Sequence, residues 1–266
     1  MPAIDPDRLR KQVAGVASVI GDPAELRRRT LDILEFYADR TRRPGPSTRV
    51  DDVSPAFGVA RPVMKSLTQA LRRAAAGKPE RGLAAAEALW QTGYREARLL
   101  AAALVGDQFG EPVMEWVESH ARTTDDNIVL ADLAGQSTAG WRVAEPGGFV
   151  DQLARWLDSS RRGTQQLAYL AMTSAVEDPR FHQLPRLFGL LAGRAGSVRG
   201  ETRKALYRLL RALARRSPPE TTHFLIAEVA GGDPAAIRMA RNVIDSLPHD
   251  AAGRLRLTIP GGPRAR

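Results

Sequence analysis

Apolar residues recur along this chain with the period of an α-helix and not with that of a β-strand. Most segments repeat Leu, Val, Ile or Ala every three to four residues, which gives each one an apolar face and a polar face. No alternating run bounded by turn residues predicts a strand. The pattern predicts helices over residues 5–20, 23–39, 61–77, 80–91, 94–106, 111–122, 126–136, 147–157, 161–175, 180–193, 199–216, 219–230 and 233–246.

Two segments lack this pattern. Residues 41–55 are rich in Pro, Gly and Ser, and they predict a loop inserted between helices. From Pro248 onward, the apolar repeat is lost, so residues 248–266 predict a tail without regular structure. We therefore expect one domain over residues 1–247.

The helices also form a loose repeat of pairs. Similar apolar segments begin at Leu99, Val129, Gln166, Lys204 and Arg238, at spacings of about 30 to 38 residues. Helix pairs at this period are typical of an α-solenoid of the HEAT type, in which stacked pairs bury a continuous core. The fold class is thus predicted to be all-α, a HEAT-like solenoid. A helical bundle without repeats is the alternative.

Several predicted helices carry a polar stripe opposite their apolar face. In residues 201–216, four leucines mark one side of the helix, and cations at i, i+4, i+7 and i+11 mark the other. Residues 61–72 repeat this spacing. We expect the stripes to line a curved, basic, concave surface. Their members are Arg61, Lys65, Thr68, Arg72, Arg162, Gln166, Thr173, Lys204, Arg208, Arg211, Arg215, Arg238, Arg241 and Asn242.

The overall charge supports an anionic partner. The formal net charge is +9 and the isoelectric point is about 10.6, which favours nucleic acid over an acidic membrane surface. There is no cysteine, and the four histidines are scattered, so we expect neither a metal site nor a cofactor. No apolar run predicts a membrane span, and the charged N-terminus does not resemble a secretory signal. We expect a monomer in the cytoplasm, associated with the nucleoid.

Familiar catalytic motifs are missing from the sequence. It contains no GxSxG elbow, no GxxxxGK[ST] phosphate loop and no GxGxxG after a strand. The acidic pair Asp125-Asp126 falls in a predicted turn, where it is expected to cap the following helix. The tryptophans are expected to anchor the core, except Trp141, whose loop-like surroundings predict exposure.

Several segments resemble the AlkD family of DNA alkylation repair glycosylases, which are HEAT-like repeat proteins. FGVARPVMKSL (57–67) is similar to that family's Gly-hydrophobic-x-x-Pro entry into a helix, and Leu83–Val105 carries its LW…E.R..A pattern. Met114–Ser137 resembles the segment with the catalytic aspartate, and Arg203–Arg215 resembles a late helix that touches DNA. The resemblance runs from about residue 57 to residue 247.

This resemblance implies a DNA glycosylase that hydrolyses the N-glycosidic bond of an N-alkylated base without metal or cofactor. Asp132 aligns with the family's catalytic carboxylate, which stabilises the oxocarbenium-like sugar and positions the attacking water. Lys204, Arg208 and Arg211 would grip phosphates near the lesion, and Arg61, Lys65 and Arg72 would grip the flanking duplex. The expected partner is double-stranded DNA, alkylated or distorted.

The chain departs from the family at the aromatic positions that would hold a cationic base. Ile128 stands where the family has a tryptophan four residues before Asp132, and Arg208 stands at the second tryptophan. Gln166, preceded by Gly163, replaces a family arginine, whereas Arg211 matches one. Smaller residues would open room for a bulky adduct. Two alternatives remain: a non-catalytic relative that binds distorted or branched DNA, and a protein-interaction scaffold.

Overall fold

The computed structural model describes residues 4–39 and 54–259, and within these ranges the only regular structure is helical. The all-α prediction is confirmed. The elements are α1 (Pro6–Ala17), α2 (Pro23–Phe36), α3 (Arg61–Ala75), α4 (Pro79–Trp90), α5 (Arg95–Leu104), α6 (Glu111–Thr123), α7 (Asn127–Gln136), α8 (Ala139–Ala144), α9 (Pro146–Leu157), α10 (Arg162–Glu177), α11 (Leu184–Leu191), α12 (Gly200–Arg216), α13 (Pro218–Ala230), α14 (Pro234–Val243), the 3-10 helix η1 (Ile244–Ser246) and α15 (His249–Thr258).

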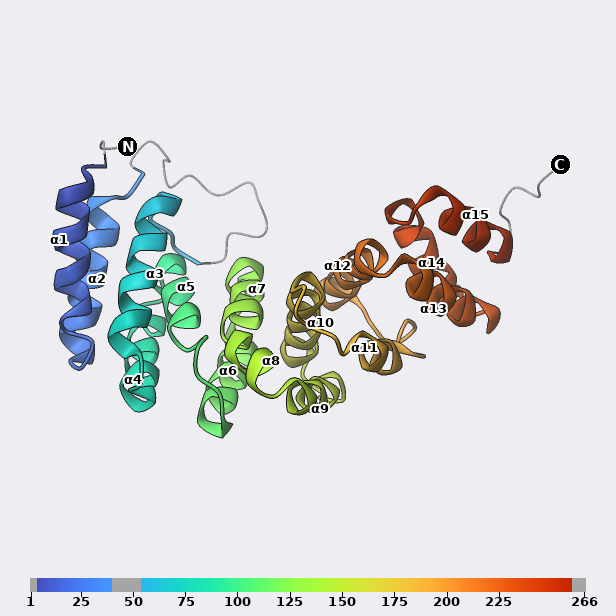
Figure 1. The fold of residues 1–266 in the computed structure, drawn as a ribbon, viewed down its shortest axis with the longest axis horizontal. Helices are drawn as coiled ribbons and strands as arrows, with labels where there is room; N and C mark the ends of the chain where they lie inside the picture. Colours follow the sequence, from blue (N-terminus) through green and yellow to red (C-terminus); the bar gives the residue numbers. More distant parts are fainter. Residues whose placement is uncertain (1–3, 40–53, 260–266) are drawn as a thin grey trace. The chain divides into compact units, whose positions relative to one another are not determined.

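The chain divides into two compact units, Met1–Trp141 and Arg142–Arg266. In the first unit, α1, α3, α5 and α7 follow one another in a layer, each in contact with the next (Figure 1). A second layer contains α2, α4 and α6; α2 and α4 pack together, and the Trp90 and Trp116 rings of α4 and α6 meet edge to face at 5.3 Å. This is the stacking of helix pairs that the repeat predicts. The single domain expected over residues 1–247 stays a prediction.

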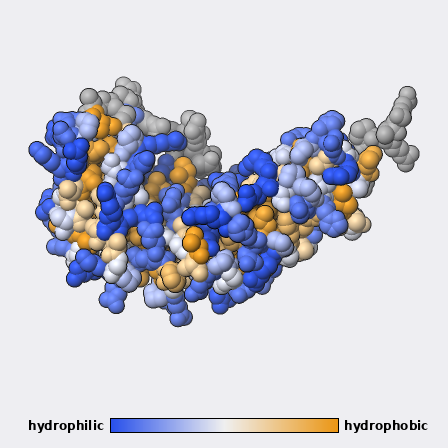
Figure 2. All heavy atoms as spheres, in the orientation of Figure 1, coloured by the Kyte–Doolittle hydropathy of each residue, from blue (hydrophilic) through white to orange (hydrophobic). Residues whose placement is uncertain are grey.

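The second unit has the same two-layer construction. Helices α10, α12 and α14 form one layer, and α9, α11, α13 and α15 form the other. The predicted apolar faces are buried: Leu206, Leu209, Leu210 and Leu213 of α12 are each at most 3% exposed. Hydrophilic residues cover most of the visible surface of each unit, with hydrophobic side chains in smaller patches between them (Figure 2).

The structure corrects the predicted extent of helical structure in two places. The segment around Trp141 forms α8, and Trp141 is buried there, not exposed. The Gly140 N–H donates to the Gly106 carbonyl at 2.7 Å, and a Cβ at Gly140 would lie 2.8 Å from that oxygen. This close approach, which depends on a residue distant in sequence, holds the segment against α5.

The second correction concerns the predicted tail, of which residues 249–258 form α15. Its buried residues are Ala251, Ala252 and Leu255, a stripe too short to stand out among the surrounding arginines. Residues 260–266 of the tail, and residues 41–53 of the predicted loop, lie outside the described ranges.

Candidate active site

A cleft of about 530 Å³ opens in the first unit. Its walls come from the segment 56–60 and from helices α3, α5 and α7, which are neighbours in one layer (Figure 1). Asp132 of α7 lines it, as do Arg61 and Lys65 of α3. The structure therefore brings two cations that we expected on the flanking duplex into the same cleft as the expected catalytic carboxylate.

Asp132 is a half-buried carboxylate without a partner. It makes no hydrogen bond or ion pair with any residue in the described ranges. Burial alone raises the pKa of Asp132 from 3.8 to about 6. Because burial penalises the charged form, an unpaired carboxylate in such a place costs stability at neutral pH. Residues of this kind cluster at functional sites, which makes Asp132 a candidate on physical grounds.

Ile128 and Gln136 extend the same face of α7, one turn before and one turn after Asp132. Ile128 is 49% exposed, which is unusual for a large hydrophobic residue of this protein. Gln136 lines the cleft, and its side-chain amide has no hydrogen-bond partner in the described part of the chain. The face therefore offers an apolar side chain, a carboxylate and an amide in succession.

The cations on α3 differ in their surroundings. Arg61 and Lys65 lie one turn apart, both exposed, and neither forms an ion pair within residues 4–39 and 54–259. Arg72, by contrast, forms a two-pronged ion pair with Asp107. Arg72 could therefore contact a DNA phosphate, as we expected, only after its ion pair with Asp107 had broken.

Glu96 shapes the wall of the cleft. Its buried carboxylate accepts the backbone N–H groups of Phe57 at 3.0 Å, Gly58 at 2.7 Å and Val59 at 3.4 Å. Gly58 has φ of 70°, a left-handed conformation that favours glycine and turns the three N–H groups toward one acceptor. Glu96 thus fixes the segment that precedes α3, the helix that carries the cleft cations Arg61 and Lys65.

Arg95 fixes the start of α7. Asp126 caps this helix, as predicted, by accepting the N–H groups of Ile128 and Val129 at 2.9 and 3.2 Å. The other oxygen of Asp126 accepts from Arg95 Nε at 2.9 Å, in a pair whose carboxylate side chain is fully buried. Because the pair links α5 to the first turn of α7, it sets the position of Asp132 relative to the opposite wall.

Comparison with known proteins identifies the family of this chain. A sequence model of the family described as "DNA alkylation repair enzyme" matches residues 32–244. The chain belongs to the DNA alkylation repair enzyme family. The matched range covers most of the chain and includes every wall of the cleft. No curated protein and no solved structure matches the chain.

The family's expected DNA contacts on α12 belong to the second unit. Arg208 and Arg215 are exposed and have no partner within the described ranges. Lys204 pairs with Glu201 at 2.6 Å, a mostly exposed ion pair, and Arg211 Nη2 donates to Asn242 at 2.5 Å. Exposed pairs of this kind are weak, so they leave these cations able to exchange their partners for phosphates.

The other predicted contacts of the second unit divide into two groups. Arg162 and Arg238 are exposed and Gln166 is half-buried, so all three reach the surface. Thr173 is 1% exposed, and its hydroxyl donates to the Tyr169 carbonyl at 2.8 Å. Its assignment to the polar stripe was wrong, because Thr173 satisfies its hydroxyl on its own helix and packs inside.

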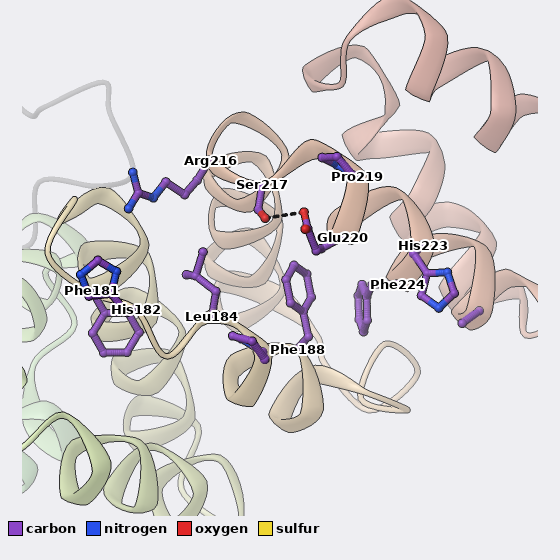
Figure 3. A pocket seen from close by; sticks show the side chains of 12 residues that line it. Phe181, His182, Leu184, Phe188, Arg216, Ser217, Pro219, Glu220, His223 and Phe224 are labelled. Atoms are coloured by element: carbon purple, nitrogen blue, oxygen red, sulfur yellow. Dashed lines mark hydrogen bonds between the residues drawn. The ribbon is translucent and has the colours of Figure 1, made fainter.

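A larger cavity of about 790 Å³ lies between α11 and α13 of the second unit (Figure 3). Phe181, Phe188 and Phe224 form much of its wall. Its carboxylate, Glu220, accepts from the Ser217 hydroxyl at 2.6 Å, which lowers the pKa of Glu220. The acid of this cavity is thus already paired, unlike Asp132 in the cleft of the first unit.

The described residues contain neither a membrane-spanning helix nor a cluster of metal-ligating side chains. None of their helices is long and apolar enough to cross a membrane. No group of three or more His, Asp or Glu side chains in residues 4–39 and 54–259 could hold a metal ion.

Proposed function

We propose that this member of the DNA alkylation repair enzyme family is a DNA glycosylase that excises N-alkylated bases, with Asp132 as its catalytic carboxylate. The observation that carries the proposal is the cleft, where an unpaired, half-buried Asp132 shares the walls with the unpaired cations Arg61 and Lys65. These are the two charge types that a nucleotide undergoing glycosidic cleavage requires.

The chemistry assigns a task to Asp132. N-alkylation gives a purine a positive charge, so the base leaves with the bonding electrons and becomes neutral. The deoxyribose acquires oxocarbenium character at C1′, which a fixed carboxylate stabilises in a site of low polarity. Water then forms the new bond to C1′ and gives up a proton, leaving a free base and an abasic site. The raised pKa of Asp132 also suits it to orient this water and accept its proton.

The cations provide binding to the DNA backbone. Arg61 and Lys65 would contact phosphates beside the target nucleotide, and Arg208 and Arg215 of α12 would contact phosphates through the second unit. Such contacts position the duplex without reading its sequence.

The exposed side chain of Ile128 would influence which alkylated bases the protein excises. It lies one turn before Asp132, where the resemblance to the AlkD family implies a tryptophan, so a flipped base would meet an aliphatic wall and not an aromatic one. This favours adducts that bring their own apolar or aromatic body. Ile128→Trp should therefore increase the release of small N-methylpurines relative to that of bulky N-alkyl adducts. An unchanged ratio would remove Ile128 from the specificity argument.

The decisive experiment measures base release from duplex DNA that carries N-methylpurines or bulky N-alkylpurines. Wild type should release base, and Asp132→Asn should not. Asp125→Asn is the matched control, because Asp125 is exposed, lies near the same helix and makes no hydrogen bond or ion pair with a described residue. It should retain wild-type release.

Two outcomes favour the alternatives. Tight binding of distorted or branched duplexes without base release, unaffected by Asp132→Asn, would indicate a non-catalytic DNA-binding relative. Failure to bind duplex DNA at low salt would indicate a protein-interaction scaffold, because the unpaired cations would then have no phosphate partner.

A further inference from the structure

Lys65 places a primary amine in the candidate cleft. It lines the same cleft as Asp132. Lys65 belongs to α3, whereas Asp132 belongs to α7. The chain has only four lysines, Lys11, Lys65, Lys78 and Lys204, among 39 basic residues, and Lys65 is the one of these that lines this cleft. A primary amine, unlike a guanidinium, can act as a nucleophile toward a carbonyl group.

The amine is also available. Lys65 is exposed and forms no ion pair with an acid of the described ranges, although Asp39, Glu96 and Asp132 line the same cleft. Glu96 is occupied by three backbone N–H groups. The flexible four-carbon stem of a lysine lets its amine move within the cleft, while the buried setting of α7 keeps Asp132 in place.

We propose that Lys65 gives this protein a second activity, an abasic-site lyase, in which its amine forms a Schiff base with the deoxyribose aldehyde of an abasic site. The lyase uses the same cleft as the proposed glycosylase, and it takes the product of that reaction as its substrate. It rests on the proposed function only in placing the sugar of an abasic nucleotide beside Asp132.

The reaction balances without an oxidant or a metal. The Lys65 nitrogen bonds to C1′ of the ring-opened sugar, and water leaves to give an iminium ion. A carboxylate removes a C2′ proton; the C–H electrons form the C2′=C3′ double bond, and the C3′–O bond breaks with its electrons on the departing phosphate. Water then hydrolyses the iminium ion and regenerates the amine.

The neighbours of Lys65 supply what these steps need. Asp132 is the unpaired carboxylate of the cleft, and its raised pKa of about 6 suits the removal of a proton better than an ordinary aspartate would. Arg61 lies one turn before Lys65 on α3 and has no acid partner among the described residues, so its guanidinium would stabilise the departing phosphate.

The test uses the full chain and a duplex that contains a preformed abasic site, with sodium borohydride to reduce the imine to a stable covalent bond. Wild type should give a covalent protein–DNA adduct, mapped by mass spectrometry to Lys65. Lys65→Arg keeps the charge but removes the nucleophile, so the adduct should fall at least about tenfold. The double variant Lys11→Arg/Lys78→Arg, which alters two exposed lysines outside the cleft, should give as much adduct as wild type.

Strand cleavage separates the two steps. Asp132→Asn should still form the adduct but cleave the abasic strand more slowly, because imine formation does not need the carboxylate. An adduct that forms equally well with Lys65→Arg, or that maps to another lysine or to the terminal amine, overturns the proposal. The abasic site is supplied ready made, so the two proposals can fail separately. Release of alkylated bases without adduct formation would refute only the lyase. Adduct formation without release of alkylated bases would refute only the glycosylase.

Discussion

We expect Asp132 to lower the stability of the folded protein at neutral pH, and its substitution by asparagine should reveal this directly. Burial raises the pKa of Asp132 from 3.8 to about 6. Between these values the folded chain holds a proton that the unfolded chain has lost, so the contribution of Asp132 to stability falls as pH rises through this window. At 1.36 kcal/mol per pH unit, the loss amounts to about 3 kcal/mol above pH 7.

Asparagine keeps the shape of aspartate but cannot ionise. Asp132→Asn should therefore raise the free energy of unfolding by about 3 kcal/mol at pH 8 and by roughly half of that at pH 5. Urea unfolding curves at several pH values measure the difference, since the change in surface exposed on unfolding is the same for both proteins. Asp125→Asn, at an exposed position, should change stability by less than about 0.5 kcal/mol at every pH.

Two results would refute this reasoning. A difference between wild type and Asp132→Asn that stays constant from pH 5 to pH 8 would mean that the carboxylate is not desolvated. A variant less stable than wild type would mean that the charge has a stabilising partner. A gain in stability combined with a loss of base release, by contrast, is the signature of a residue retained for chemistry at the expense of the fold.

Four further outcomes follow from the site. Base release from cationic N-alkylpurines should rise with pH through about 6 and then level off, because Asp132 must be ionised while the leaving base needs no proton; a pH–rate profile measures this. Glu96→Ala should lower the free energy of unfolding by about 3 kcal/mol or more in urea titrations, because three backbone N–H groups lose a charged acceptor. Gly58→Ala should lower it by about 1–2 kcal/mol, because alanine disfavours φ of 70°. Removing Arg208 and Arg215 together should reduce the slope of log K against log salt for duplex binding by about 1.8, if each contacts one phosphate.

Matched variants give these outcomes their meaning. Glu115→Ala removes an exposed glutamate without a partner in the described ranges and should be nearly neutral. Gly189→Ala adds a methyl group to helix α11 where nothing lies within 4 Å, and it should stabilise by about 0.5–1 kcal/mol. Arg27→Ala removes an exposed cation on α2, in the layer away from the cleft, and should leave the salt slope unchanged. If a test variant and its control had equal effects, the effect could not be attributed to the contact that the test variant removes.

Local patterns in the sequence predict most of the fold because helices are local structures. The apolar period marks each predicted helix, and Asp126 is recognisable as a cap from its place before α7. The two helices that were missed, α8 and α15, are short, and their apolar stripes have few members. Their formation depends on contacts such as that of Gly140 with Gly106, which no local pattern records.

Contacts between distant residues explain what the sequence could not predict about the site. Glu96 is the acid of the LW…E.R..A pattern, but nothing near it in sequence indicates that its carboxylate accepts N–H groups from 37 to 39 residues earlier. The pairing of Arg72 with Asp107 spans 35 residues in the same way. Composition and spacing can place a cation on a helix face, but only the packed structure decides whether an acid from another helix reaches it.

The unpaired charges of the cleft, taken together, indicate the kind of ligand that the cleft would bind. Arg61, Lys65 and Asp132 line one cavity, yet no ion pair joins the carboxylate to either cation. A cleft that keeps opposite charges apart is complementary to a ligand that also carries separated charges. A nucleotide undergoing glycosidic cleavage is such a ligand, with an anionic phosphodiester on one side and a developing cation at the sugar on the other. The free protein bears the cost of the unpaired carboxylate. In the proposed reaction, the transition state would remove that cost, because its sugar would supply the missing positive charge only as the glycosidic bond breaks. An ordinary stabilising salt bridge at the same place would weaken catalysis by satisfying Asp132 before the substrate arrived.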